Sequence, residues 1–136
     1  MAQCKVLLTG GAGFIGSNIA ASLIEHPNID KIVVLDNLST GFEENISHLL
    51  KHPKLSFYKG DIRDFKTCME ASKGMDVVCH QAALGSVPRS IKDPVTTNEV
   101  NINGTLNVFY SAKENGIKKV VFASSSSVYG YNPSLP

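Results

Sequence analysis

The sequence predicts an α/β fold in which a doubly wound parallel sheet carries five strands in the order 3-2-1-4-5. Short runs rich in β-branched residues alternate with helical patterns along the whole chain of 136 residues. Several of these runs are continuously apolar, as strands covered on both faces should be. Short connections between alternating elements favour parallel strands joined by right-handed crossovers.

Five segments are predicted strands: 5–9, 31–36, 55–60, 76–80 and 119–124. In a sheet of this order, a ligand binds at the carboxyl ends of the first and fourth strands, where the strand order reverses. The small and polar residues that follow each strand are therefore the first candidates for a functional site.

Four segments are predicted helices: 14–26, 43–50, 64–72 and 94–115. The first carries branched aliphatic residues on one stripe, Ile15, Ile19 and Leu23. The second begins at "TGFE", which resembles a capping box from Thr40 to Glu43. Asp64 opens the third helix. Asp93 and Pro94 open the fourth, and Gly116 suits its left-handed cap.

Composition indicates one ordinary globular domain. Thirteen basic and twelve acidic side chains leave a net charge of +1, so neither nucleic acid nor an anionic membrane is expected as a partner. The longest apolar runs are of strand length, too short to span a bilayer. Three widely spaced cysteines and four scattered histidines fit neither a disulfide framework nor a metal site, so no metal is predicted. The N-terminus carries no export signal, and a cytoplasmic protein with reduced thiols is expected.

A glycine-rich turn, "TGGAGFIGS", joins the first strand to the first helix. Two registers fit it: Gly11, Gly13 and Gly16 as G-x-G-x-x-G, or Gly10, Gly13 and Gly16 as G-x-x-G-x-x-G. In both, backbone amides and the positive end of a helix face the crevice where a pyrophosphate would lie. Glycines also serve plain tight turns, but the strand before and the helix after favour a phosphate site.

The second strand ends at Asp36, which lies 36 − 16 = 20 residues after Gly16. This is the spacing expected of the carboxylate that binds a dinucleotide ribose. A carboxylate there accepts hydrogen bonds from both ribose hydroxyls and repels a 2′-phosphate. The sequence therefore predicts NAD rather than NADP as the cofactor.

The later strand ends add weaker signals. Asp61 and Ile62 in "GDIRD" are interpreted as neighbours of an adenine, although Asp61 also suits a turn cap. Ala82 and Ala83 in "HQAALGS" leave room for a cofactor against the backbone. His80 alone is interpreted as a hydrogen-bonded packing residue. The serine run of "ASSSSVYG" lies at the mouth of the crevice, or in a solvated turn.

Taken together, "TGGAGFIGS", "DNLSTG", "GDIRD", "HQAALGSVPRSIKDP", "NINGTLNV" and "VVFASSSSVYG" resemble the extended short-chain dehydrogenase/reductase family. The most similar branch is that of the NAD-dependent nucleotide-sugar epimerases and dehydratases. The resemblance runs from residue 5 to the end, with the motifs in family order. It implies that residues 1–136 form a Rossmann-type NAD-binding domain.

The resemblance also implies roles for individual residues. The glycine motif and pyrophosphate contacts would be Gly10, Gly13, Phe14, Ile15 and Gly16. The adenosine side would be lined by Asp36, Asn37, Ser39, Thr40, Asp61 and Ile62. The nicotinamide side would be lined by Gln81, Ala82, Ala83 and Asn101. Ser125 matches the catalytic serine, with Ser124 and Ser126 beside the sugar. Gly85, Ser86 and Arg89 either face the sugar or belong to a loop that is only a connector.

The sequence departs from the family at its catalytic Tyr-x-x-x-Lys. Four residues after the tyrosines 58, 110, 129 and 131 stand Ile62, Glu114, Pro133 and Leu135. In relatives that motif lies on the next helix, and the sugar-nucleotide-binding half follows. We therefore expect an N-terminal fragment, truncated before the catalytic Tyr-Lys helix and lacking the substrate-binding C-terminal part.

Two functions fit these residues. In the first, the parent protein is a UDP-hexose 4-epimerase, acting on UDP-glucose, UDP-galactose or an N-acetylated form through a 4-keto sugar, as a homodimer. In the second, the chain as given binds NAD and performs no chemistry. UDP-glucuronate epimerases and decarboxylases remain neighbouring alternatives. Dehydration is disfavoured, because Ser126 and Ser127 stand where dehydratase relatives place an Asp-Glu pair.

Overall fold

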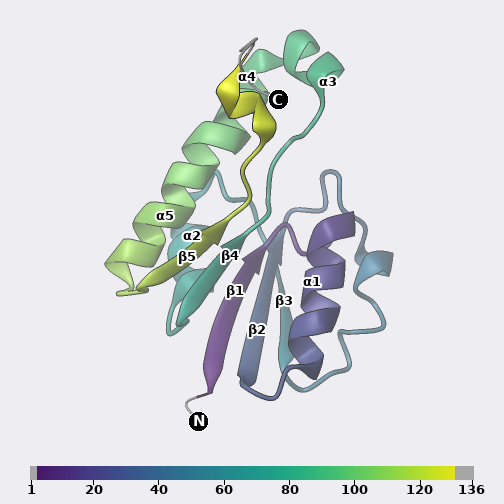
Figure 1. Ribbon diagram of the computed structural model, residues 1–136, viewed down its shortest axis with the longest axis vertical. Helices are drawn as coiled ribbons and strands as arrows, with labels where there is room; N and C mark the ends of the chain where they lie inside the picture. The colour runs from purple at the N-terminus through teal and green to yellow at the C-terminus, as the bar shows by residue number, and fades with distance from the viewer. Residues whose placement is uncertain (1–2, 131–136) are drawn as a thin grey trace.

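The computed structural model describes residues 3–130, which form a five-stranded parallel sheet in the order β3-β2-β1-β4-β5 (Figure 1). The strands are β1 (Cys4–Thr9), β2 (Ile29–Asp36), β3 (Leu55–Lys59), β4 (Val77–His80) and β5 (Lys119–Phe122). The predicted fold class and strand order are confirmed. Each predicted strand is present and differs from its expected bounds only at the ends.

The central strands β1 and β2 are buried over residues 6–9 and 32–35, where both faces of the sheet are covered, whereas Lys5, Asp30 and Lys31 near their starts are exposed. The covering helices are α1 (Phe14–Glu25), α2 (Phe65–Ser72) and α5 (Thr105–Glu114). Leu7 and Leu35 point into the core shared with α2 and α5, whereas Leu8 and Val34 point into the core under α1. This alternation follows from the two-residue period of a strand. Figure 1 shows α1 on one side of the sheet and α2 with α5 on the other.

Helix α1 rests on the sheet through small residues. Its buried positions are Gly16, Ser17, Ala20 and Ile24. Ile15 is 63% exposed, and Ile19 and Leu23 are only partly buried at the margin of the core. The aliphatic stripe is therefore not the face that this helix buries. These small side chains let the start of α1 lie close to the glycine turn, at the edge of the candidate site.

The predicted helix over 43–50 is wrong. The structure has a single 3-10 turn, η1 (Glu43–Asn45), followed by further turns. Its N-cap residue is Phe42, without a side-chain cap, and not Thr40 as the predicted capping box required. The amide of Phe42 and the side-chain amide of Asn45 donate to the carbonyl of Ala12 at 3.1 and 2.8 Å. These contacts tie the segment to the glycine turn.

The predicted helix over 94–115 is present but divided. It consists of α4 (Pro94–Asn98), a π-helical turn η2 (Glu99–Gly104), and α5. Asp93 caps it as expected, accepting from the amide of Thr96 at 3.1 Å, and Gly116 adopts a φ of +72° beyond its end. An additional short helix, α3 (Val87–Lys92), precedes it and was not expected.

The third predicted helix is confirmed as α2, with Asp64 as its cap: the carboxylate accepts from the amides of Lys66 and Thr67. A 3-10 turn, η3 (Ser126–Tyr129), follows β5. Tyr131, Pro133 and Leu135 lie outside the described residues. Within residues 3–130, the helices are too short or too polar for any of them to cross a membrane.

Candidate functional site: a dinucleotide cleft at the strand ends

The glycine turn leaves no space for side chains at two of its positions. Gly10 has a φ of +69°, and a Cβ atom there would lie 2.6 Å from the amide nitrogen of Ala82. A Cβ atom on Gly16 would collide with the carbonyl oxygen of Gly10. At Gly11 the added atom would meet only the side chain of Val34. Backbone contacts therefore require glycine at the first and last positions of the G-x-x-G-x-x-G register.

The start of α1 faces the cleft with its own backbone. Gly13 is the N-cap residue, and within the described residues neither a capping side chain nor an acidic residue occupies the first turn. The first amide groups of a helix have no partners within it, and they add to the positive end of the helix dipole. This arrangement suits a phosphate group.

Asp36 is held beside this turn by two backbone amides. Its Oδ2 accepts from the amide of Ala12 at 2.9 Å, and its Oδ1 accepts from the amide of Leu38 at 2.8 Å. Leu38 takes a φ of +60°, which is uncommon for a residue with a Cβ atom. The carboxylate is thereby fixed in orientation at the end of β2, next to the glycine turn.

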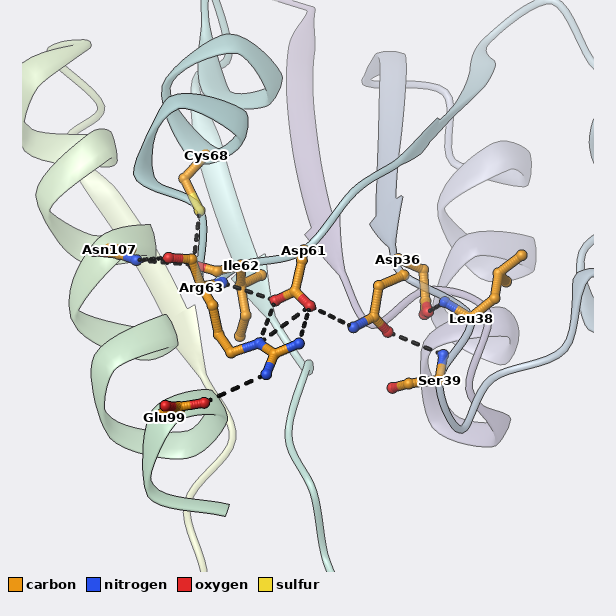
Figure 2. Close-up of polar contacts among 10 residues, drawn as sticks. Asp36, Leu38, Ser39, Asp61, Ile62, Arg63, Cys68, Glu99 and Asn107 are labelled. Atoms are coloured by element: carbon orange, nitrogen blue, oxygen red, sulfur yellow. Dashed lines mark hydrogen bonds and ion pairs between the residues drawn. The ribbon is translucent and has the colours of Figure 1, made fainter. Parts of the chain in front are cut away.

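A hydrogen-bonded chain connects the end of β2 to the segment after β3 (Figure 2). The Asn37 side chain accepts from the amide of Ser39 at 3.0 Å and donates to Oδ2 of Asp61 at 2.9 Å. The guanidinium of Arg63 lies 2.7 Å from the same oxygen and 3.4 Å from Glu99. The hydrogen bonds from Arg63 hold the pKa of Asp61 at about 2, so this carboxylate stays ionised at neutral pH.

Ile62 forms a buried part of the cleft wall. Its carbonyl accepts from the side chain of Asn107 at 3.0 Å and from Sγ of Cys68 at 3.3 Å (Figure 2). A Cβ atom on Gly104 would lie 2.6 Å from the Ile62 side chain, so the π-helical turn packs tightly against it. Burial raises the pKa of Cys68 to about 12, and its thiol serves packing rather than nucleophilic chemistry.

One cleft at the carboxyl ends of the strands brings many of the sequence-predicted residues together. They are Gly10, Gly13, Asp36, Asn37, Ser39, Thr40, Asp61, Ile62, Gln81, Ala82 and Ala83. The cleft lies where the strand order reverses, between β1 and β4, as expected for a sheet of this kind. Its lining also includes Gly41, Gly60, Leu84 and Val100. The first three stand in quoted motifs, whereas Val100 precedes the motif that begins at Asn101.

Other predicted residues lie outside this lining. Phe14 and Ile15 border a separate apolar groove on α1, and Gly16 is buried beneath the turn. The side chain of Asn101 makes a two-point contact with the backbone of Leu84, accepting at 2.7 Å and donating at 3.0 Å. Ser86 caps α3 by accepting from the amide of Arg89 at 3.3 Å.

The remaining predicted substrate residues do not line the cleft. Gly85 has open space around its Cα atom, and Ser124, Ser125 and Ser126 are exposed after the end of β5. Their predicted roles concern a sugar that would lie beyond the nicotinamide end, and those roles stay predictions.

The chain is similar in sequence to known proteins. The sequence model described as the NAD dependent epimerase/dehydratase family matches residues 6–136. A putative UDP-glucose 4-epimerase of Methanocaldococcus jannaschii is 44% identical over 133 residues, which cover 96% of this chain and 41% of the relative. The chain thus spans about two fifths of the length of that curated relative.

Solved structures agree in fold. A UDP-N-acetylglucosamine 4-epimerase from Methanobrevibacter ruminantium, in complex with UDP-N-acetylmuramic acid, superimposes with a TM-score of 0.88 at 43% identity, over 100% of this chain and 42% of the other. A UDP-glucose 4-epimerase of Thermus thermophilus in complex with NAD gives 0.82 at 40% identity, over 96% and 40%. The chain belongs to the NAD-dependent epimerase/dehydratase family.

Proposed function

We propose that the whole protein is a nucleotide-sugar 4-epimerase and that this chain provides its NAD site. The observation that carries the proposal is the position of Asp36. Its carboxylate is fixed by the amides of Ala12 and Leu38, next to the uncapped start of α1. A carboxylate suited to a ribose thus lies beside a helix start suited to a pyrophosphate, and this proximity supports a dinucleotide as the ligand.

The residues of the cleft fit NAD. The backbone space kept open by Gly10 and the first turn of α1 would hold the pyrophosphate. Asp36 would accept from the adenosine ribose, with Asn37, Ser39 and Thr40 around it, and the wall at Asp61 and Ile62 would lie against the adenine. Gln81, Ala82 and Ala83 would follow the nicotinamide side, and Asn101 would hold that side through Leu84.

The chemistry proposed for the whole protein is inversion at C4 of a UDP-hexose through a 4-keto sugar. NAD, when bound, supplies the hydride acceptor and donor for this oxidation and reduction. In this chain, the Ser125 hydroxyl would hydrogen-bond the reacting sugar hydroxyl and orient it. Ser124 and Ser126, with Gly85 and Ser86, would border the sugar. Relatives named for UDP-glucose and UDP-N-acetylglucosamine support a UDP-hexose, plain or N-acetylated.

A second candidate is an NAD-binding module without catalysis of its own. It is favoured by one sequence observation: lysine follows none of the four tyrosines at the spacing of a Tyr-x-x-x-Lys motif. Residues 1–136 by themselves are therefore proposed to bind NAD but not to epimerise a sugar. Adding UDP-glucose or UDP-N-acetylglucosamine to the NAD-loaded chain tests this, and product formation would reject it.

Cofactor choice tests the proposed site directly. We predict that NAD binds at least about tenfold more tightly than NADP, because the 2′-phosphate would meet the Asp36 carboxylate as a like charge. The Asp36→Ala change should weaken NAD binding by on the order of 1–3 kcal/mol. It should also reduce the difference in affinity between NAD and NADP. Calorimetric titration of both cofactors measures this, with Asp30→Ala as an exposed control on the same strand. Equal affinity of the unaltered chain for NAD and NADP would remove Asp36 from this role.

A further inference from the structure

The end of β4 contains a buried histidine that the proposed chemistry does not use. His80 is 1% exposed and lies beside Thr9 of β1, which is fully buried. Its Nδ1 is 2.6 Å from the Thr9 hydroxyl oxygen, and its Nε2 is 3.0 Å from the Thr105 hydroxyl oxygen of α5. The imidazole therefore connects β1, β4 and α5 immediately below the cleft.

The Thr9 hydroxyl has further partners, and these decide where the histidine proton lies. Its oxygen accepts from the amide of Ala82 at 3.2 Å and from the amide of Gln81, also at 3.2 Å, which is shared with the backbone carbonyl of Thr9. A hydroxyl oxygen has two lone pairs and one hydrogen. Because both amides donate to this oxygen, the Thr9 hydrogen needs an acceptor of its own, and Nδ1 of His80 is the atom within reach.

The opposite tautomer would leave a buried group unsatisfied. A proton on Nδ1 would place a third donor on the Thr9 oxygen and leave the Thr9 hydrogen without an acceptor in a fully buried position, which is costly. A proton on Nε2 instead donates to Thr105, a half-buried residue whose own hydroxyl hydrogen can turn to solvent. Burial also lowers the pKa of His80 to about 4, so the ring is neutral at pH 7.

The amides held by Thr9 form one wall of the cleft. Gln81 and Ala82 lie so close to the glycine turn that a Cβ atom on Gly10 would be 2.7 Å from the Cα atom of Ala82. The position of this backbone therefore sets the width of the cleft between the glycine turn and the end of β4. Both sides of that gap line the proposed cofactor site.

We propose that His80 is a positioning residue: as the neutral tautomer protonated on Nε2, it orients the Thr9 hydroxyl, which fixes the Gln81–Ala82 backbone for the nicotinamide half of the cofactor. The cofactor part of this inference rests on the proposed NAD-binding function. The tautomer itself does not, because it follows from contacts within the protein.

The tautomer is measured on the unaltered chain without ligand. Long-range proton–nitrogen NMR of the ¹⁵N-labelled chain at pH 7 distinguishes a protonated ring nitrogen from a bare one, with His80→Asn to assign the signals. We expect Nε2 protonated and Nδ1 bare. A proton on Nδ1 would overturn the inference, whatever the folding behaviour of any variant.

The positioning role is tested by Thr9→Val, which keeps the shape of the side chain and removes the hydroxyl, with Thr9→Ser as the matched variant that keeps it. The valine variant should bind NAD about fivefold more weakly, while ADP, which lacks the nicotinamide half, should bind as before. The serine variant should bind both normally. Equal losses for NAD and ADP, or equal behaviour of the two variants, would overturn the positioning role.

Failure of the two proposals can be told apart. An unaltered chain that binds no NAD would overturn the proposed function. NAD binding by a chain whose His80 carries its proton on Nδ1 would overturn only the present inference.

Discussion

At the residue scale, three strand-end side chains differ in what binds them. Asp36 is held by backbone amides, and Asp61 is held chiefly by the side chains of Arg63 and Asn37. His80 is held by two hydroxyls. Each depends at least partly on a residue distant in the sequence: Asp36 on the amide of Ala12, Asp61 on Asn37 besides the neighbouring Arg63, and His80 on Thr9 and Thr105. Thr9 and Thr105 do not line the cleft, so substitutions there should act on it without touching a ligand.

His80 should make stability depend on pH. The groups that contact its ring are the hydroxyls of Thr9 and Thr105 and the rings of Phe109 and Phe122, and burial lowers its pKa from 6.5 to about 4. The unfolded chain then binds a proton between these values while the folded chain does not, so stability falls as the pH falls through this window. We predict a loss of about 2 kcal/mol between pH 7 and pH 5 from this group.

Urea unfolding at both pH values measures that loss. The His80→Asn variant should lose this part of the pH dependence, although it should be less stable at pH 7. His48→Gln, which removes an exposed imidazole, is the matched control. If the free energy of unfolding changed equally between pH 7 and pH 5 in the unaltered chain and the His80 variant, the prediction would be contradicted.

Ser125 is the one proposed catalytic side chain in the sequence. In the whole protein, Ser125→Ala should lower kcat far more than it raises KM, because the hydroxyl aligns the reacting oxygen during hydride transfer. Steady-state rates with UDP-glucose and UDP-N-acetylglucosamine measure the two constants, with Ser90→Ala on α3 as a control. Normal turnover with poor substrate affinity would reassign Ser125 to binding.

At the element scale, the glycine turn determines how α1 starts. An alanine in place of a helical glycine ordinarily stabilises by about 1 kcal/mol, but at Gly16 the added methyl group would collide with the Gly10 carbonyl. We predict that Gly16→Ala instead destabilises by about 1–3 kcal/mol, the usual cost of overpacking. Denaturant unfolding tests this against Gly85→Ala, where the added atom meets open space. A neutral or stabilising result at Gly16 would show that the turn can move away.

Elements were predictable from the sequence where their determinants are local. The caps at Asp64, Asp93 and Gly116 act within a few residues, and the structure confirms them. The failed helix over 43–50 and the π-helical turn depend instead on distant contacts: Asn45 reaches Ala12, and Asn101 reaches Leu84. The site divides in the same way. The glycine spacing and Asp36 predict the cofactor-binding residues from local sequence. Thr9 and His80 carry no such signal, because their contact arises only when β1 and β4 pair in the sheet.

At the scale of the whole molecule, the sheet is least covered at its β5 edge. The edge strand β5 is exposed along its length, and it lies beside α5 in Figure 1. The exposed apolar side chains on these elements and on η2 are Ile102, Leu106, Phe109, Tyr110, Val120, Val121 and Phe122. The rings of Phe109 and Phe122 are 5.6 Å apart, so α5 and β5 join in one apolar face, whereas Val121 points to the opposite face of the sheet.

Such a face is expected to recruit another chain. Contiguous apolar surface is a usual site of protein association, and the outer edge of β5, with which no strand within residues 3–130 pairs, adds backbone groups that a second strand can bind. We predict that residues 1–136 self-associate as concentration rises, and that the double variant Ile102→Lys with Leu106→Lys shifts the equilibrium toward the monomer. Light scattering over a concentration series measures this, with Val87→Lys and Val95→Lys as matched changes at exposed valines outside the face. A chain that remains monomeric throughout, or that responds equally to both pairs of changes, would show that this face does not drive association.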